Sequence, residues 1–247
     1  PIRKANPYRR MAKAIKTNNY TDNLLHREFE CYGPRYVLLT DITYIPYNAT
    51  FAYLSTILDA YTKQILSYVL SESLEVDYVK ETVEILMRDH GISLHKETLI
   101  HSDQGSHYTS TTFIRIIEDS DLRRSMSRRG NCWDNAPQES FFGHFKDECD
   151  YKKCRTLKEL QAQVDDYRVY YNEKRRLWER GKMTPSEYEA YLESLDEEDF
   201  REYMKKEEAV FLKKKEKSAQ AAVEKANSRK KAIKDKLEEI ENETGSK

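Results

Sequence analysis

The sequence predicts a mixed α/β fold, in which a five-stranded sheet is flanked by helices and followed by a C-terminal helical extension. Three observations lead to this prediction. Three β-rich segments follow one another between residues 36 and 73, separated only by turn-like breaks of two or three residues. Two further short β-rich segments then alternate with segments of helical periodicity. After residue 151 the chain is helical and rich in tyrosine.

The first three strands are expected at 36–47, 51–61 and 64–73, where β-branched and aromatic residues are frequent. The breaks between them, Asn48-Ala49-Thr50 and Thr62-Lys63, are short and turn-like. We therefore expect hairpins and an antiparallel meander.

Alternating helices and strands complete the predicted sheet. An amphipathic segment from Val76 to His90 places apolar side chains on one face and ends at Gly91. The elements expected after it are a strand at 98–103, a capped helix at about 110–119, a strand near 122–126 and a helix from about 136 to 150. Because helical crossovers add parallel strands, the order β-β-β-α-β-α-β-α matches the ribonuclease H-like (RNase H-like) fold.

Helices are also expected beyond this core. Apolar and tyrosine side chains at helical spacing predict a helix over 157–176, and Thr184, Pro185 and Glu187 form the capping pattern of a short helix. From about residue 196 Lys, Glu and Ala dominate, which is typical of a solvated helix or a partly disordered tail. The predicted domains are a basic linker or arm (1–33), an RNase H-like catalytic core (34–152), a C-terminal helical subdomain (153–195) and a charged tail (196–247).

Composition limits the class of protein. The chain has 247 residues, 38% of them hydrophobic, which is enough for one substantial domain. No run of about 18 apolar residues predicts a membrane span. The four cysteines include no CxxC pair, so we expect reduced thiols in the cytoplasm rather than a zinc site. Because the chain begins with Pro and has no signal-peptide pattern, we expect a fragment or a processed product.

The distribution of charge is more informative than the net charge of −1. Six basic residues and no acid occur in the first twenty positions. A second basic cluster contains Arg115, Arg123, Arg124, Arg128 and Arg129. Local basic patches hold phosphate backbones even when the whole chain is neutral, although an isolated cluster is more often a solvated surface.

Three acids stand out as a set. Asp41 lies in mid-strand among apolar residues, where a lone carboxylate is unfavourable unless it is paired or metal-bound. Asp103 ends the strand 98–103, at a carboxyl edge where ligand sites are common, and Glu139 lies in the first turn of the helix that begins near 136. Singly, each would more often be structural. Together, three hard oxygen donors describe a site for two Mg²⁺ or Mn²⁺ ions that catalyse in-line phosphoryl transfer.

The spacing and context of these acids resemble a known family. Sixty-one residues separate Asp41 from Asp103, and 35 separate Asp103 from Glu139, which is the spacing of DD(35)E transposases and retroviral-type integrases. The segments that resemble the second-frame integrase core of the bacterial insertion-sequence three family are NLLHREF (23–29), TDITYI (40–45), HSDQGSHYTS (101–110), GNCWDNAPQESFFGHFKDE (130–148), YYNEKRR (170–176) and MTPSEY (183–188). The resemblance runs from about residue 2 to 192. It departs from the family at Gln138, where a small residue is usual, and at 177–179, where the family has a His-rich stretch.

The resemblance implies a transposase that cleaves and transfers DNA strands, with Asp41, Asp103 and Glu139 as its metal-binding catalytic acids. Lys146 also matches the family, and it lies two helical turns after Glu139, so we expect it to reach a DNA phosphate. Further DNA contacts are expected from Arg123, Arg124, Arg128, Arg129, Asn131, Trp133 and Asn135. The loop before the helix at 136 contains Asn131, Trp133, Asp134 and Asn135, which could position DNA or organise the helix start. The alternative for Asn135 is a helix cap.

For three other residues near Asp103 we expect mainly structural roles. His101 and His107 flank it, and a packed or surface histidine is more common than a role in orienting the acid. Gly105 is expected to supply a turn conformation.

The expected partners are DNA, as element ends and target, and further copies of the chain on that DNA. The family's helix-turn-helix, which recognises element ends, is absent from this sequence, so we expect an upstream segment or a first-frame protein to supply it. Such a protein would act in the bacterial cytoplasm, associated with the nucleoid when bound to DNA.

Two other functions stay open at this point. One is an RNase H-like nuclease, such as an RNA–DNA hybrid hydrolase or a resolvase. The other is a catalytically inactive or domesticated DNA-binding relic. The 35-residue spacing argues against the first, and the intact set of acids argues against the second.

Overall fold

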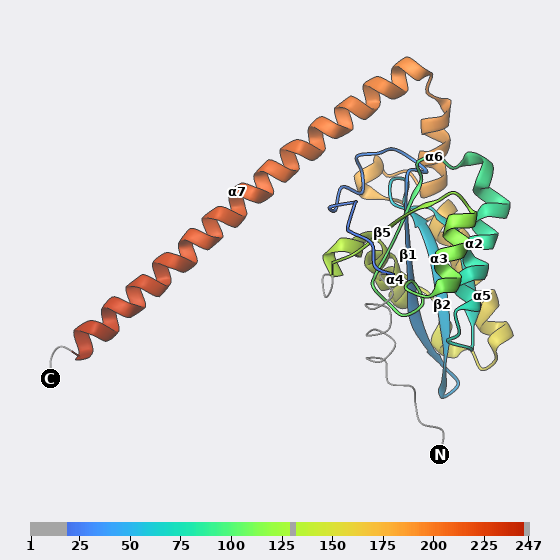
Figure 1. The fold of residues 1–247 in the computed structure, drawn as a ribbon, viewed down its shortest axis with the longest axis horizontal. Helices are drawn as coiled ribbons and strands as arrows, with labels where there is room; N and C mark the ends of the chain where they lie inside the picture. The colour runs from blue at the N-terminus through green and yellow to red at the C-terminus, as the bar shows by residue number, and fades with distance from the viewer. Residues whose placement is uncertain (1–18, 129–131, 245–247) are drawn as a thin grey trace. The chain divides into compact units, whose positions relative to one another are not determined.

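Five strands form one mixed sheet in the order β3-β2-β1-β4-β5 (Figure 1). A computed structural model describes residues 19–128 and 132–244 of the chain. The strands are β1 (Val37–Tyr47), β2 (Thr50–Asp59), β3 (Ile65–Ser71), β4 (Leu99–Ser102) and β5 (Arg123–Met126). β2 pairs antiparallel with β1 and β3, whereas β4 pairs parallel with β1 and β5. The predicted meander and the two added parallel strands are therefore confirmed.

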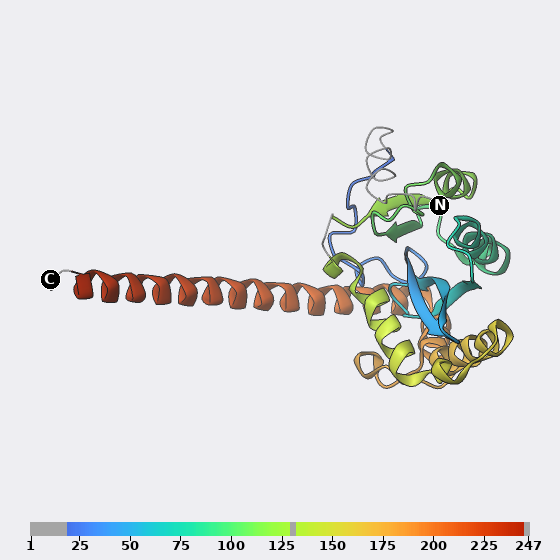
Figure 2. The ribbon, with the colours of Figure 1, turned by 90° about the horizontal axis from the view of Figure 1, so that it is seen from below.

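Helices cover both faces of this sheet (Figure 2). The helices on one face are α2 (Asp77–His90) and α3 (Thr111–Asp119), and those on the other are α4 (Ala136–Glu148) and α5 (Leu157–Glu173). Two neighbouring residues of β1 show the division. Leu38 is buried among side chains of α2 and α3, whereas Leu39 is buried among side chains of α4 and α5, because successive side chains of a strand point to opposite faces.

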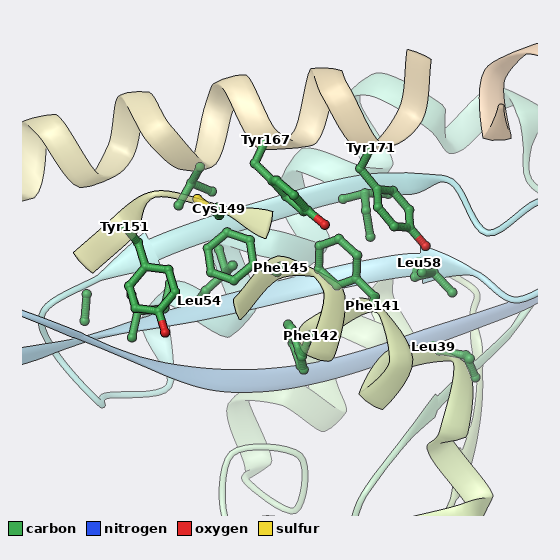
Figure 3. Close-up of a cluster of buried hydrophobic side chains, with 14 of the residues drawn as sticks. Leu39, Leu54, Leu58, Phe141, Phe142, Phe145, Cys149, Tyr151, Tyr167 and Tyr171 are labelled. Carbon is green, nitrogen blue, oxygen red and sulfur yellow. The ribbon is translucent and has the colours of Figure 1, made fainter. Parts of the chain in front are cut away.

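Aromatic side chains hold α4 against α5 (Figure 3). Phe141 packs edge-on against Tyr171 with ring centroids 4.8 Å apart, and Phe145 packs against Tyr167 at 5.1 Å. All four rings are buried, and each such pair adds about 0.5–1.5 kcal/mol beyond its area burial. Since Glu139 lies in the first turn of α4, this packing fixes the helix that carries it.

The helix α6 (Pro185–Ser194) begins with the predicted capping box. The Glu187 backbone N–H donates to the Thr184 hydroxyl at 3.1 Å, and the Thr184 N–H donates to the Glu187 carboxylate at 2.9 Å. Residues 19–33, for which we predict a linker, lie against the core, and Leu25 in this segment is fully buried.

The chain divides into two units, Pro1–Asp196 and Glu197–Lys247. The second unit contains one long helix, α7 (Glu197–Thr244), so the charged tail is helical over that range. Its side chains up to residue 229 are mostly exposed, as expected for a solvated helix. Among the described residues, no helix has the length and apolar character that a membrane crossing requires.

Candidate active site

Asp41 lies in the middle of β1 with both carboxylate oxygens held. Its Oδ1 accepts a hydrogen bond from the Ile42 N–H at 2.8 Å, and its Oδ2 accepts one from the Asn135 side-chain amide at 3.3 Å. Burial and the negative charges of Asp103 and Glu139 together raise the pKa of Asp41 to about 7. Asp41 is therefore close enough to both other acids for their charges to act on it.

Asp103 reaches the site because of the parallel pairing of β4 with β1. Leu39 of β1 lies opposite His101 of β4. Asp41 lies two residues beyond Leu39 on β1, and Asp103 lies two residues beyond His101, directly after the end of β4. The register of the two strands therefore brings together two acids that are far apart in sequence. Burial also raises the pKa of Asp103, against the opposing effects of the Gly105 N–H and the charge of His107.

Gly105 allows a close approach of the backbone to Asp103. Its N–H donates to Asp103 Oδ1 at 2.8 Å, and a Cβ at this position would lie 2.8 Å from the same oxygen. Among the described glycines, only Gly33 and Gly181 have a positive φ. Gly105 begins a turn in which the Thr109 N–H donates to its backbone oxygen at 3.1 Å, but it has no left-handed conformation, so the absence of a side chain explains the glycine.

Glu139, the third predicted acid, lies in the first turn of α4, where its side chain is exposed. Asn135 occupies the N-cap position of this helix, but its side chain makes no capping hydrogen bond. Its amide is turned toward Asp41 instead. The residue thus links the start of α4 to β1.

The donor set suits hard divalent cations, although no three His, Cys, Asp or Glu side chains within 19–128 and 132–244 are already gathered as a metal site. Carboxylate oxygens are the ligands that Mg²⁺ prefers. Two buried oxygens here, Asn135 Oδ1 and Gln138 Oε1, have no hydrogen-bond partner among the described residues. Gln138 belongs to this site because its amide nitrogen donates to Thr56, the β2 residue opposite Asp41.

Asp134, in the segment before α4, binds side chains that the sequence does not place near it. Its buried carboxylate accepts hydrogen bonds from Arg27 Nε at 2.7 Å, Asn23 Nδ2 at 2.8 Å and the Arg128 guanidinium at 2.9 Å. The bond from Arg128 is the largest of the effects that hold the pKa of Asp134 well below its usual range. This carboxylate fixes the residues immediately before Asn135 to the segment 23–27, and we refer to these contacts as the Asp134 clamp.

The two histidines beside Asp103 have packing roles. His101 is buried between two hydroxyl groups, with its ring nitrogens 2.9 Å from Ser125 Oγ and 3.0 Å from Ser127 Oγ. Burial lowers the pKa of His101 to about 4. His107 Nε2 lies 2.8 Å from the backbone oxygen of Leu74. The packed interpretation is therefore the one that the contacts favour.

The candidate DNA-contacting residues lie in different surroundings. Lys146 is exposed on α4, and Trp133 is 69% exposed in the preceding loop. Arg123 is exposed and pairs with Glu97 at 3.1 Å. Arg124 is half-buried and donates to the backbone oxygens of Asn19 and Tyr108.

Arg128, as part of the Asp134 clamp, already uses its guanidinium within the protein. Arg129 and Asn131 lie outside the described residues. The DNA contacts of all these residues stay predictions.

Comparison with known proteins agrees with this geometry. Two family models, both described as integrase core domain, match residues 32–132 and 139–191. The chain is 32% identical to an uncharacterized transposase-like protein of Haemophilus influenzae, over 70% of this chain and 79% of that protein. It is 28% identical to transposase InsF for insertion sequence IS3A of Escherichia coli (strain K12), over 68% of this chain and 59% of InsF.

Other relatives are longer than this chain. The InsK protein of insertion sequence element IS150 from E. coli (strain K12) is 34% identical over 67% of this chain, which spans only 58% of the length of InsK.

The fold also resembles a solved structure. A chain in the structure of the simian T-cell lymphotropic virus intasome has a TM-score of 0.51 at 15% sequence identity, covering 68% of this chain and 57% of that chain. At that identity the likeness shows the RNase H-like fold alone.

Proposed function

The chain belongs to the insertion-sequence three family of transposases with an integrase core, and we propose that it catalyses metal-dependent cleavage and transfer of DNA strands during transposition of an insertion element. The reaction class is polynucleotidyl transfer by a DDE-type enzyme. One observation carries the proposal most strongly. The charges of Asp103 and Glu139 both raise the pKa of Asp41, which supports a shared site for the three acids.

In this proposal Asp41, Asp103 and Glu139 hold two Mg²⁺ or Mn²⁺ ions through their carboxylate oxygens. When bound, the ions supply Lewis-acid stabilisation to the attacking and leaving oxygens of an in-line displacement. The chain itself supplies orientation. The Ile42 N–H and the Asn135 amide fix Asp41, and the Gly105 N–H fixes Asp103. No covalent protein nucleophile is required.

DNA is the proposed substrate, as element end and as target. Lys146, two helical turns after Glu139, would hold a phosphate beside the acids. The exposed Trp133 and Arg123 are further candidates. We also propose that copies of the chain assemble on DNA, and that an upstream segment or a first-frame protein recognises the element ends. The proposed place of action is the bacterial cytoplasm, at the nucleoid.

A strand-transfer assay tests this function. Labelled oligonucleotides from the ends of the element are incubated with a plasmid target, Mg²⁺ and the protein. We expect cleavage at the element end and joining to the plasmid. The variants Asp41→Asn, Asp103→Asn and Glu139→Gln should each abolish both steps but still bind DNA in metal-free buffer, because each change removes one metal ligand and leaves the basic residues intact. Asp147→Asn, a change of an exposed acid on the same helix, should retain activity.

The possible products separate the alternatives. Cutting without joining would identify a nuclease instead of a transposase, and DNA binding without cutting would identify an inactive relic. Strand transfer that persisted in Asp103→Asn would contradict the assignment of the acids.

A further inference from the structure

A pocket of about 490 Å³ lies beside the first turns of α4, and none of the three acids lines it. Its volume is in the range of small-molecule and cofactor sites. One wall is formed by Ala136, Pro137, Ser140 and His144 of α4. The remainder comes from residues 29–30, the β2–β3 turn and the segment from Tyr171 to Arg180.

The rim of this pocket carries an exposed indole. The side chain of Trp178 is 80% exposed, although its backbone is ordered as the first residue of a 3-10 turn. The turn is held by hydrogen bonds from the Leu177 N–H to Met183 O at 2.9 Å and from the Met183 N–H to Arg180 O at 3.1 Å. Lys182 Nζ lies 4.9 Å from the centre of the Trp178 ring. A flat apolar surface is thus exposed on an ordered turn, beside a positive charge.

The charged residues of the lining are predominantly basic. The lining contains four basic side chains and two carboxylates. The basic residues are Lys63, Arg175, Arg176 and Arg180, and the acids are Glu30 and Glu179. Lys63 and Arg180 are held by Glu30 at 3.2 and 3.0 Å.

Arg176 is the basic lining residue most readily recruited by a ligand. Its side chain is 61% exposed, donates to the Lys182 backbone oxygen at 2.9 Å and pairs at 3.2 Å with Glu187, which is 49% exposed. Because an exposed pair is worth at most about 1 kcal/mol, a phosphate can take the place of the Glu187 carboxylate. The pocket therefore combines an aromatic surface with a cation at its edge.

We propose that this pocket binds an unpaired nucleobase of the DNA strand under processing, stacked on Trp178 with its phosphate at Arg176; this rests on the proposed function. The base must be unpaired, since a stacked and paired base has no free face for an indole. The position on α4 supports access. Glu139 directly precedes Ser140, so the acid and the pocket wall lie roughly 100° apart around one helix axis. A strand that reaches Glu139 therefore passes close to the pocket.

Fluorescence of 2-aminopurine tests the proposal on the full-length protein in metal-free buffer. The probe is placed in a single-stranded oligonucleotide, in a duplex overhang and within a paired duplex. We expect the two unpaired probes to be quenched on binding, and the paired probe to be unaffected. Trp178→Ala should weaken binding of the unpaired probe about tenfold and remove the quenching, whereas Trp178→Phe should keep most of both. Arg176→Ala should lower the salt slope of log K by about one.

Matched controls use residues outside the pocket. Phe51→Ala removes another exposed aromatic ring, and Arg88→Ala removes another exposed guanidinium. Neither should change the quenching. A thermal melt of Trp178→Ala should match that of the wild type, because an 80% exposed side chain contributes little to the core.

The outcomes distinguish this proposal from the proposed function. If DNA is bound but wild type and Trp178→Ala quench the unpaired probe equally, the pocket assignment is overturned and the transposase function stands. If no DNA is bound or cut at all, the function itself fails. If Trp178→Ala changes only the sedimentation of the DNA-free protein, the pocket holds a second copy of the chain and not a base.

Discussion

Asp41 shows how opposing effects are balanced at a single residue. Burial and two nearby negative charges favour its neutral form, whereas the Ile42 N–H and the Asn135 amide favour the carboxylate. The first group of effects is larger, because the pKa of Asp41 is about 7 instead of 3.8. The free protein near neutral pH therefore holds an unfavourable cluster of negative charge, which a bound cation would relieve.

Metal-free stability should reveal this cluster. Because the folded protein binds the Asp41 proton more tightly than the unfolded chain, the stabilisation is complete below about pH 4 and is lost as the pH rises to about 7. In the Asp41→Asn variant the side chain at this position is an amide, which cannot ionise. In EDTA at pH 8 the variant should therefore be more stable than wild type, by about 2 kcal/mol after allowance for partial exposure, and the advantage should vanish near pH 4.

Urea unfolding between pH 4 and pH 8 measures this difference. Asp147→Asn is the control, since Asp147 is exposed on α4. A constant difference between Asp41→Asn and wild type at every pH would contradict the raised pKa. Addition of Mg²⁺ at pH 8 should stabilise wild type more than Asp41→Asn.

Some site residues were predictable from sequence and others were not. Asp41, Asp103 and Glu139 have local signals, namely an acid within or at the end of a strand and an acid in the first helical turn. The contacts of Asp134 with Asn23 and Arg27 have no such signal, because these partners are 111 and 107 residues away. Only the folded chain shows that this acid holds the segment 23–27.

At the scale of elements, α4 is fixed from two sides. The rings of Phe141 and Phe145 pack its length against α5, and the Asp134 clamp fixes the residues that lead into it. The segment 23–27 is itself in an unfavourable conformation, since His26 and Arg27 have φ values of 48° and 68°. Hydrogen bonds from the Leu25 and His26 N–H groups to Asn23 Oδ1 help to hold this turn.

We predict that the clamp sets the position of Asn135 and Glu139. Asp134→Asn should reduce the rate of strand transfer with little change in DNA affinity, because it loosens the start of α4 and removes no basic residue. Arg27→Ala should have a similar, smaller effect. Since Arg27 and Arg128 are 43% and 59% exposed, the loss of stability in Asp134→Asn should be modest, about 1–3 kcal/mol.

A double-mutant cycle checks this prediction. The effects of Arg27→Ala and Asp134→Asn on the transfer rate should be less than additive, because both remove the same contact. Arg27→Lys should recover part of the rate. Full additivity, or a loss of DNA affinity without a loss of rate, would show that Arg27 acts on DNA and not through Asp134.

Periodicity and turn chemistry predict each described strand and α-helix of the first unit to within a few residues, whereas the short 3-10 helices have no such signal. The segment 157–176 illustrates the limit, since α5 ends at Glu173 and Arg175 instead pairs with Glu148 of α4. The packing of residues 19–33 was missed for a similar reason. This mostly polar segment has no periodic apolar pattern, and its packing rests on the buried Leu25 and the partly buried Tyr20 and Phe29.

For the whole molecule, the chain divides into two units at Asp196. The first unit contains the sheet, all three acids and α6. In α6, Tyr188 and Leu192 are buried, and Glu189 pairs with Arg35. The second unit has a different composition, with long runs of Lys and Glu and few apolar residues. These facts indicate that the first unit carries its own core.

Truncation tests that independence. A chain that ends at Asp196 should melt within about 2 °C of the full-length protein, because it retains every buried residue of the first unit. Its circular dichroism should lose the helical signal of α7. A chain that ends at Lys182 is the matched control, since it also removes α6 with Tyr188, Leu192 and the Arg35 partner Glu189. Loss of these buried groups should cost several kcal/mol and lower the melting temperature by at least about 10 °C. If both truncations lowered the melting temperature equally, the core would depend on α7, and the division of the chain at Asp196 would not describe how it folds.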